Sequence, residues 1–350
     1  MTTAFETIQL GSSTLRNRIA MAPMTRSRAS GSDGTPTELM VEYYAQRASA
    51  GLIITEGIQS SAVGQGYPST PGLHSPVQVE AWRKVTDRVH DAGGRIFAQL
   101  MHAGRVGHPN TLPDGLVPVG PSAVAAKGQV FTPNGMEDFV TPVALSEIEV
   151  LETIGDFAIA ACNAIDAGFD GVELHGANGY LLHQFLAPGS NRRTDDWGGS
   201  VEGRIRLTVE TARAVADAIG GDRIGLRISP GNPFNDIVEE DLEATYGALV
   251  DEVNSVGLAY LHLAEGPDRA LTNALRKSFD GAFILSPNTA KRPTSVEELG
   301  LIEDGVADVL AFGTLFLANP DLPVRLAAGG PFNAPDRATF YGGGAKGYTD

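Results

Sequence analysis

The sequence contains a single cysteine, Cys162, among 350 residues. One cysteine cannot form a disulfide within the chain, so no internal disulfide holds the fold. Cys162 lies in a helix-like run of alanines and isoleucines between positions 154 and 167, and nothing nearby favours a thiolate. We expect this side chain to pack against the core and to have no chemical role.

Basic residues and long hydrophobic runs are also scarce. The chain has 26 Lys and Arg against 42 Asp and Glu, a formal net charge of -16 at pH 7, and no basic cluster interleaved with aromatics. Such a chain repels polyphosphate, so we expect no nucleic-acid partner. No segment approaches the roughly 20 apolar residues that span a bilayer, and positions 1–11 do not resemble a signal peptide. We expect no membrane segment and a cytoplasmic location.

What the sequence does contain is an alternation of short β-branched runs with longer amphipathic stretches, repeated about eight times. This pattern is typical of parallel strands joined by helices, and barrels of this type often use such a length as one domain. We therefore predict an α/β fold, a (β/α)₈ TIM barrel formed by residues 1–350 as a single domain. The expected strands are Ile19–Ala22, Leu52–Glu56, Ile96–Leu100, Gly171–Leu174, Ile224–Ile228, Tyr260–Leu263, Phe283–Leu285 and Val309–Phe312.

Two features of the connections stand out. Gly168 and Gly257 each follow an expected helix and precede a strand, where a left-handed residue lets the chain turn back. The stretch Gly104–Thr141 is long, rich in glycine and proline and without periodicity. We predict that it forms an excursion over the barrel after the third strand, and its length suggests a lid.

Polar residues or glycines lie in or directly after most of the expected strands, where barrel enzymes carry their chemistry. Together with glycine-bearing turns, they predict a site for a phosphate-carrying cofactor, because backbone N–H groups there can cradle a dianion. The pattern does not identify the cofactor. In strand order these residues are Pro23, Met24 and Thr25; Glu56 and Gly57; Gln99; His175 and Asn178; Arg227; Asn288 and Thr289; Gly313 and Thr314.

Some of these residues also have structural interpretations. Taken alone, His175 also fits a structural role, in which the ring hydrogen-bonds a backbone carbonyl. A zinc site formed by His175 and His183 would lack a third ligand. Arg227 alone fits a barrel-interior arginine paired with a carboxylate. The charged residues of NRRTDDWGGSVEGR, positions 191–204, are best interpreted as a salt-bridged loop that braces the turn before it.

The segment LHGANGYLLHQFLAPGSNRRTDDWGGSVEGR, positions 174–204, resembles the Old Yellow Enzyme family of FMN-dependent ene reductases. Further motifs of that family cover essentially the whole chain. They include LRNRIAMAPMTRSRA at 15–29, GYPSTPGLHS at 66–75, GRIFAQLMHAGR at 94–105, ANPDLPVRL at 318–326 and FYGGGAKGYTD at 340–350. The resemblance implies FMN as cofactor, NADPH or NADH as reductant, and a ping-pong reduction of activated C=C bonds in enones, maleimides and nitroalkenes.

The resemblance also implies roles for particular residues. His175 and Asn178 would bind the substrate oxygen, and Tyr180 would protonate the α-carbon. Arg227 would lie near the flavin N1 and O2, where positive charge stabilises the reduced cofactor. The remaining cofactor contacts would be Pro23, Met24, Thr25, Gly57, Gln99, Asn288, Gly313 and Thr314, and the substrate space would be lined by Tyr67, Met101, Phe234 and Tyr341.

Three positions depart from the family pattern. Thr314 stands where relatives have a phosphate-binding arginine, and we hypothesise that Lys291 or Arg292 replaces that charge. The loop LSPNTAKRP lacks the usual glycines, and the flexible Met101 stands where many relatives carry a bulky aromatic.

Other functions remain open at this point. The same chemistry would serve nitrate esters or nitroaromatics, and a flavin-binding sensor without turnover has the same sequence features. A dienoyl-thioester reductase would need an iron-sulfur cluster, which one cysteine does not support. A barrel lyase or aldolase would need a reactive lysine or a metal cluster at the strand ends, and neither is evident. The oligomeric state is not encoded in any feature we recognise.

Overall fold

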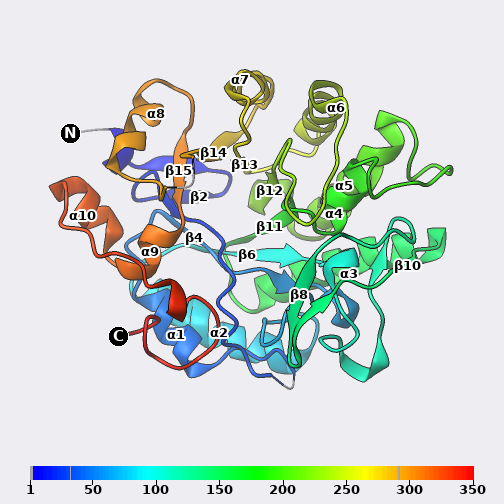
Figure 1. Ribbon diagram of the computed structural model, residues 1–350. Helices are drawn as coiled ribbons and strands as arrows, with labels where there is room; N and C mark the ends of the chain where they lie inside the picture. The colour runs from blue at the N-terminus through cyan, green and yellow to red at the C-terminus, as the bar shows by residue number, and fades with distance from the viewer. Residues whose placement is uncertain (1–2, 32, 291) are drawn as a thin grey trace.

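A computed structural model describes residues 3–31, 33–290 and 292–350, and parallel strands form a closed barrel at its centre (Figure 1). The main sheet has nine strands, of which the short β5 (Ile58–Gln59) pairs on β6 alone and the other eight form the barrel. The ring closes through the pairs β15 with β3 and β6 with β11. The barrel strands are β3 (Ile19–Met21), β4 (Leu52–Ile54), β6 (Ile96–Met101), β11 (Gly171–Gly176), β12 (Ile224–Ile228), β13 (Tyr260–Ala264), β14 (Ala282–Ser286) and β15 (Val309–Phe312).

All eight predicted strands are therefore confirmed, with ends that shift by one or two residues. Helices between them form the outer layer of the barrel (Figure 1). Two of the longest start at capping boxes, Ser75 with Gln78 and Ser146 with Glu149, which satisfy the free N–H groups of the first turn. The helices are α1 (Glu38–Ala45), α2 (Pro76–Asp91), α3 (Glu147–Asp166), α4 (Leu181–Leu186), α5 (Val201–Ile219), α6 (Leu242–Asn254), α7 (Arg269–Ser278), α8 (Gly300–Glu303), α9 (Thr314–Ala318) and α10 (Leu322–Ala328).

The barrel interior is apolar at one end and polar at the other. An N-terminal hairpin of β1 (Ile8–Leu10) and β2 (Ser13–Leu15) packs with Phe97 and Tyr260 in the apolar interior cluster. Since side chains alternate along a strand, Gln99 and His262 follow these two residues on the same inward face, one level nearer the carboxyl ends. The polar level is thus the floor of whatever binds at that mouth.

The excursion predicted after the third barrel strand is present, but it is not without regular structure. It contains β7 (Val119–Gly120) and an antiparallel hairpin of β8 (Gln129–Thr132) and β9 (Gly135–Asp138), and just after it β10 (Val143–Ala144) pairs with β7. The two-residue connection of Pro133 and Asn134 leads into Gly135 at φ 106°. Four-residue strands give too short an alternation to detect in the sequence, which is why this hairpin escaped prediction.

The prediction that Cys162 packs against the core is wrong. The buried face of α3 carries Phe157, Ala160, Ala161 and Ala164, and the position after Ala161 is turned outward, so Cys162 is exposed. By contrast, Gly168 and Gly257 have φ values of 87° and 72° and confirm the left-handed turns predicted for them. No helix within the described part of the chain has the length and apolar character to cross a membrane.

Candidate functional site

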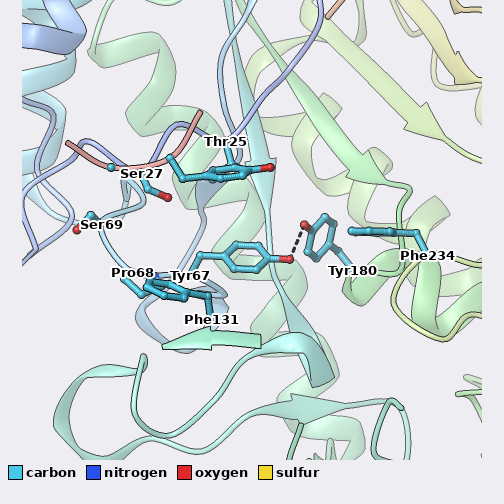
Figure 2. Close-up of a pocket in the computed structure, with 10 residues that line it drawn as sticks. Thr25, Ser27, Tyr67, Pro68, Ser69, Phe131, Tyr180 and Phe234 are labelled. Carbon is cyan, nitrogen blue, oxygen red and sulfur yellow. Dashed lines mark hydrogen bonds between the residues drawn. The ribbon is translucent and has the colours of Figure 1, made fainter. Parts of the chain in front are cut away.

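A cavity of about 700 Å³ opens beyond the strand ends, and half of its ten lining residues are aromatic (Figure 2). Five of its lining residues were predicted from the sequence as site residues: Thr25, Tyr67, Tyr180, Phe234 and Tyr341. The other lining residues were not predicted. They are Ser27, Pro68, Ser69, Phe131 and Gly342, of which Phe131 comes from the unpredicted hairpin β8–β9.

Tyr67 and Tyr180 point toward each other within this cavity (Figure 2). Their hydroxyl oxygens lie 3.0 Å apart, and their rings meet edge to face with centroids 6.4 Å apart. Burial, together with the neighbouring Tyr67, raises the pKa of Tyr180 well above its ordinary value. Tyr180 therefore keeps its proton at neutral pH and presents it inside an apolar space.

The turn that carries Tyr180 is held on several sides. Asn178 and Gly179 adopt left-handed backbone conformations, with φ values of 56° and 78°. The Asn178 amide N–H donates to Ser229 Oγ at 2.9 Å, and the Gly179 N–H donates to His183 Nδ1 at 3.0 Å. His183 is in turn fixed by Glu239, whose carboxylate lies 3.2 Å from Nε2. These contacts tie the turn after β11 to the loop after β12.

The side chain of Asn178 has a defined orientation. Asn232 Nδ2 donates to Asn178 Oδ1 at 3.1 Å, and Asn235 Nδ2 donates to the Asn178 backbone carbonyl at 2.8 Å. Because the side-chain oxygen already accepts a hydrogen bond, the Nδ2 group of Asn178 is the end left to donate to a ligand. Neither Asn232 nor Asn235 was predicted, since both lie in an aperiodic loop.

His175 lies beside Tyr180, with ring centroids 4.9 Å apart. Its Nδ1 is buried and has no hydrogen-bond partner within the described residues. Burial, and then the nearby positive charge of Arg227, lower the pKa of His175 well below its ordinary value. The ring is therefore neutral at pH 7 and carries one N–H to donate.

Arg227 is the buried cation of the site. It is 9% exposed, and its Nε is buried without a hydrogen-bond partner in the part of the chain described. Burial lowers its pKa, whereas the charge of Glu173 opposes that shift. A guanidinium kept buried with unused donors fits a ligand that presents oxygen acceptors or negative charge to the barrel mouth.

Beneath the mouth lies a polar network of which sequence reasoning identified only Gln99. Gln99 Nε2 donates to Glu173 Oε1 at 2.8 Å, and Glu173 Oε2 lies 2.8 Å from His262 Nδ1. Tyr260 donates its hydroxyl to the same Oε2 at 3.1 Å. A signal was available: Glu173 stands two positions before His175, so strand alternation puts both on the inward face.

The remaining predicted contacts surround this floor. A Cβ at Gly57 would lie 2.7 Å from Met101 Sδ, so a larger residue there would have to displace the Met101 side chain. Met101 itself is buried with Tyr180 in a small apolar cluster and does not line the cavity. Pro23, Met24 and Thr25 are half-buried after β3, and Gly313 and Thr314 are half-buried where α9 begins.

Asn288 and Arg292 lie in the loop after β14. Asn288 is exposed, and its amide donates from Nδ2 to the Gly266 carbonyl at 3.0 Å. Arg292 pairs with Glu297 at 3.1 Å and with Glu298. Lys291 lies outside the described residues. The structure thus leaves the hypothesis of a replacement phosphate cation as a prediction, with Arg292 drawn toward carboxylates.

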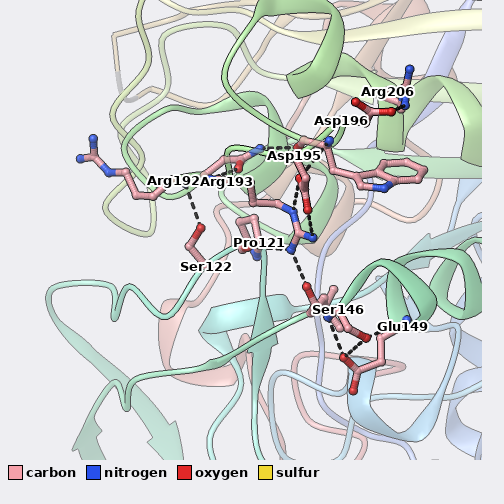
Figure 3. A network of polar contacts seen from close by, with 12 residues as sticks. Pro121, Ser122, Ser146, Glu149, Arg192, Arg193, Asp195, Asp196 and Arg206 are labelled. Carbon is pink, nitrogen blue, oxygen red and sulfur yellow. Dashed lines mark hydrogen bonds and ion pairs between the residues drawn. The ribbon is translucent and has the colours of Figure 1, made fainter.

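Two loop segments are anchored by arginines. The segment after α4 is salt-bridged as predicted, between Arg193 and Asp195, and the Arg193 guanidinium also donates to the Pro121 and Leu145 carbonyls (Figure 3). At the cavity wall, Tyr341 and Gly342 are held because the Arg26 guanidinium donates to the Phe340 and Gly347 carbonyls at 2.8 and 3.0 Å.

No group of three or more metal-ligating side chains occurs within residues 3–31, 33–290 and 292–350. Of the predicted polar groups, the Tyr67 and Tyr180 phenols line the cavity, and His175 packs against Tyr180. Asn178 lies in the same turn as Tyr180, and Arg227 pairs with His175 across neighbouring strands.

Known proteins share this sequence and fold. The profile of the NADH:flavin oxidoreductase / NADH oxidase family matches residues 3–333. A probable flavin mononucleotide-dependent alkene reductase of Leishmania infantum is 43% identical over 351 residues, covering 97% of this chain and 94% of the relative. Morphinone reductase in complex with tetrahydroNAD has a TM-score of 0.94 at 42% identity, with 100% and 97% of the two chains covered. The Old Yellow Enzyme homologue from Zymomonas mobilis has a TM-score of 0.95 at 40% identity, with 99% of both chains covered.

The barrel, its site and these likenesses define a nicotinamide-dependent flavin oxidoreductase. The chain belongs to the NADH:flavin oxidoreductase / NADH oxidase family, and the resemblance to Old Yellow Enzyme found in its motifs is confirmed.

Proposed function

We propose that this protein is an ene reductase that saturates electron-poor C=C bonds of small molecules with hydride from NADH or NADPH. When bound, FMN supplies the hydride transfer, accepting hydride from the nicotinamide and delivering it to the alkene. The proposal is supported by the alkene reductase among its relatives and by the groups that meet at the cavity. Enones, maleimides and nitroalkenes are the substrate classes that this arrangement suits.

The residues of the floor fit FMN. Arg227, buried with donors to spare, would contact the electron-rich pyrimidine edge, and Gln99 would hydrogen-bond the same edge. Thr25 would donate its hydroxyl from the cavity wall. The further contacts that we propose on the basis of the family resemblance are Pro23, Met24, Gly57, Asn288, Gly313 and Thr314.

His175 and Asn178 would bind the substrate oxygen. The neutral imidazole carries one N–H, and Asn232 leaves the Asn178 amide nitrogen as the free donor. Two neutral donors on a carbonyl or nitro oxygen draw electron density from the conjugated bond, which makes the β-carbon electrophilic. Neutral donors also avoid adding a second cation next to Arg227.

Tyr180 would give the proton to the α-carbon. Its raised pKa keeps the phenol protonated until a carbanion-like carbon needs the proton. Once that proton has left, the Tyr67 hydroxyl at 3.0 Å can turn to donate its own hydrogen to the phenolate. Tyr67, Phe234 and Tyr341 would line the substrate space, whereas Met101 would act only through Tyr180, with which it is buried. The single observation that carries the proposal is the position of this protonated phenol in the apolar cavity, directly beside His175.

The test uses purified protein under anaerobic conditions. We expect a yellow flavin spectrum, bleaching by NADH or NADPH, and recolouring by N-ethylmaleimide or an enone with formation of the saturated product. A sensor would bleach without alkene-dependent recolouring, and a lyase would have no chromophore. Either result refutes the proposal.

The variant Tyr180→Phe separates alkene reduction from reduction of nitroaromatics. Carbon protonation needs the phenol, so the variant should lose most of its alkene reduction while bleaching by the nicotinamide continues. Reduction of a nitroaromatic requires no proton on carbon and should change little. Equal losses with both acceptors would contradict the role given to Tyr180.

A further inference from the structure

The carboxylate of Glu173 is the hub of the polar level inside the barrel. It is fully buried, and it accepts hydrogen bonds from Gln99 on β6 and Tyr260 on β13 while contacting His262 at 2.8 Å. Tyr260 reaches it by crossing the interior over Gly225, where a Cβ would lie 2.0 Å from the tyrosine ring. Three strands of the barrel are thus joined through one carboxyl group.

This hub is ionised and faces one counter-charge. Burial pushes the pKa of Glu173 upward, but His262, Arg227 and Gln99 outweigh it, and the pKa is lowered from its ordinary value. Burial lowers the pKa of His262, with Arg227 acting in the same direction, so this ring is neutral at pH 7. The negative charge of Glu173 therefore balances the positive charge of Arg227.

The same carboxylate fixes the orientation of Gln99. Its Nε2 donates to Glu173 Oε1, a contact that the amide oxygen cannot make because both atoms are acceptors. Gln99 Oε1 has no partner among the described residues, and it is the end of the amide left for a ligand's N–H. His262 holds the hub in place from the far side, since its Nε2 contacts Ser286 Oγ at 2.9 Å.

We propose that Glu173, held by His262, is a positioning residue for the cofactor. It sets which end of the Gln99 amide faces FMN, and it offsets the charge of Arg227. Through these two effects it tunes the affinity and the midpoint potential of FMN. This inference rests on the proposed function, because it requires FMN over the barrel mouth. It concerns a residue whose hydrogen-bond partners are all protein side chains: Gln99, Tyr260 and His262.

The variant Glu173→Gln removes the charge and keeps the size of the side chain. Arg227 is then unbalanced, and its positive charge favours the reduced cofactor, which carries more negative charge. We expect the affinity for reduced relative to oxidised FMN to rise by roughly tenfold, which a two-electron couple registers as a shift of about 30 mV upward. The side-chain amide of Gln99 is then also free to rotate, so that its oxygen and nitrogen exchange places.

The variant Glu173→Asp separates the two effects and guards against a misfolded first variant. It keeps the charge but withdraws the carboxylate by one methylene, so the contact with Gln99 is lost. We expect several-fold weaker binding of oxidised FMN with a midpoint potential close to the unmodified one. His262→Gln tests the charge of the histidine itself: it replaces one neutral donor by another, so the potential should stay unchanged.

The experiment measures the midpoint potential of the holoenzyme by anaerobic dye-coupled titration, and FMN dissociation by fluorescence after mild removal of the cofactor. An unchanged potential in a folded, FMN-bound Glu173→Gln protein would overturn the inference. So would unchanged FMN affinity in Glu173→Asp, or a lowered potential in His262→Gln, which would mean that the histidine carries charge. If the unmodified protein binds no FMN, the proposed function itself fails.

Discussion

The hydroxyl groups of Tyr67 and Tyr180 lie 3.0 Å apart, and this contact joins the connection after β5 to the turn after β11. The two rings stand nearly perpendicular, at 88°. Both phenols line the cavity, and the Tyr67 hydroxyl lies where it can respond to loss of the Tyr180 proton.

Replacing Tyr67 by phenylalanine should slow proton transfer without affecting the nicotinamide reaction. A phenolate left at Tyr180 would lose a hydrogen bond to a charged group, which contributes about 1.5–3 kcal/mol. We expect alkene reduction to slow by roughly tenfold or more, and stopped-flow traces of cofactor bleaching to stay the same. Slowing of both half-reactions to the same extent would mean that Tyr67 only supports the fold of the cavity.

Asn232 should control how well the substrate oxygen is bound. In Asn232→Asp a carboxylate faces Asn178 Oδ1 and drives that amide to turn, so its oxygen instead of its nitrogen faces the substrate. With a hydrogen bond worth about 1 kcal/mol, KM for an enone should rise roughly fivefold. Asn232→Ala removes the contact without forcing the turn and should have the smaller effect. An equal or larger effect of Asn232→Ala would contradict this orientation.

The strand-end residues could be predicted from the sequence because barrel strands have a regular period and a fixed direction. His175, Arg227 and Gln99 were placed correctly at one mouth for that reason. Glu173 was not predicted, although the same alternation puts it inward, where it is fully buried.

The contacts from loops could not be predicted in the same way. Phe131, Asn232 and Asn235 lie in segments without period, and their positions depend on tertiary contacts such as the carbonyl of Asn178. Cys162 was misplaced because a helix rich in alanine and isoleucine gives little contrast between its two faces.

Glu56 should make stability depend on pH. Its carboxylate accepts hydrogen bonds from the backbone N–H groups of Arg26 and Ser27 at 3.0 and 3.3 Å. Burial nevertheless raises the pKa of Glu56 from 4.5 to about 7. A raised folded-state pKa means that stabilisation is present in full below pH 4.5 and is lost as pH rises toward 7.

The variant Glu56→Gln keeps an acceptor but cannot titrate. Urea unfolding at pH 5 and pH 8 should show the unmodified protein losing up to about 3 kcal/mol relative to the variant over this range. Identical pH dependence in the two proteins would mean that Glu56 titrates as an ordinary carboxyl.

Arg193 should contribute far more to the free energy of unfolding than Arg206, which also forms an ion pair in this part of the chain. Its side chain is 9% exposed and donates to the Pro121 carbonyl at 3.1 Å as well as to Asp195 (Figure 3). Arg193→Ala leaves buried carbonyls without donors and should cost about 2–3 kcal/mol in urea unfolding. Arg206→Ala breaks an exposed pair with Asp196 and should cost less than about 1 kcal/mol. Similar losses in both variants would contradict the bracing role.

Binding of the FMN phosphate should depend on cationic side chains in the loop after β14, since Thr314 supplies no positive charge. We expect the double variant Lys291→Ala and Arg292→Ala to bind FMN more weakly at low salt, with the difference shrinking as salt screens the charge. Arg292 shares its guanidinium with Glu297 and Glu298, so the single variant Arg292→Ala should show the smaller part of the loss. A double variant with unchanged FMN affinity at low salt would exclude both cations, and the phosphate would then be held by backbone N–H groups near Gly313.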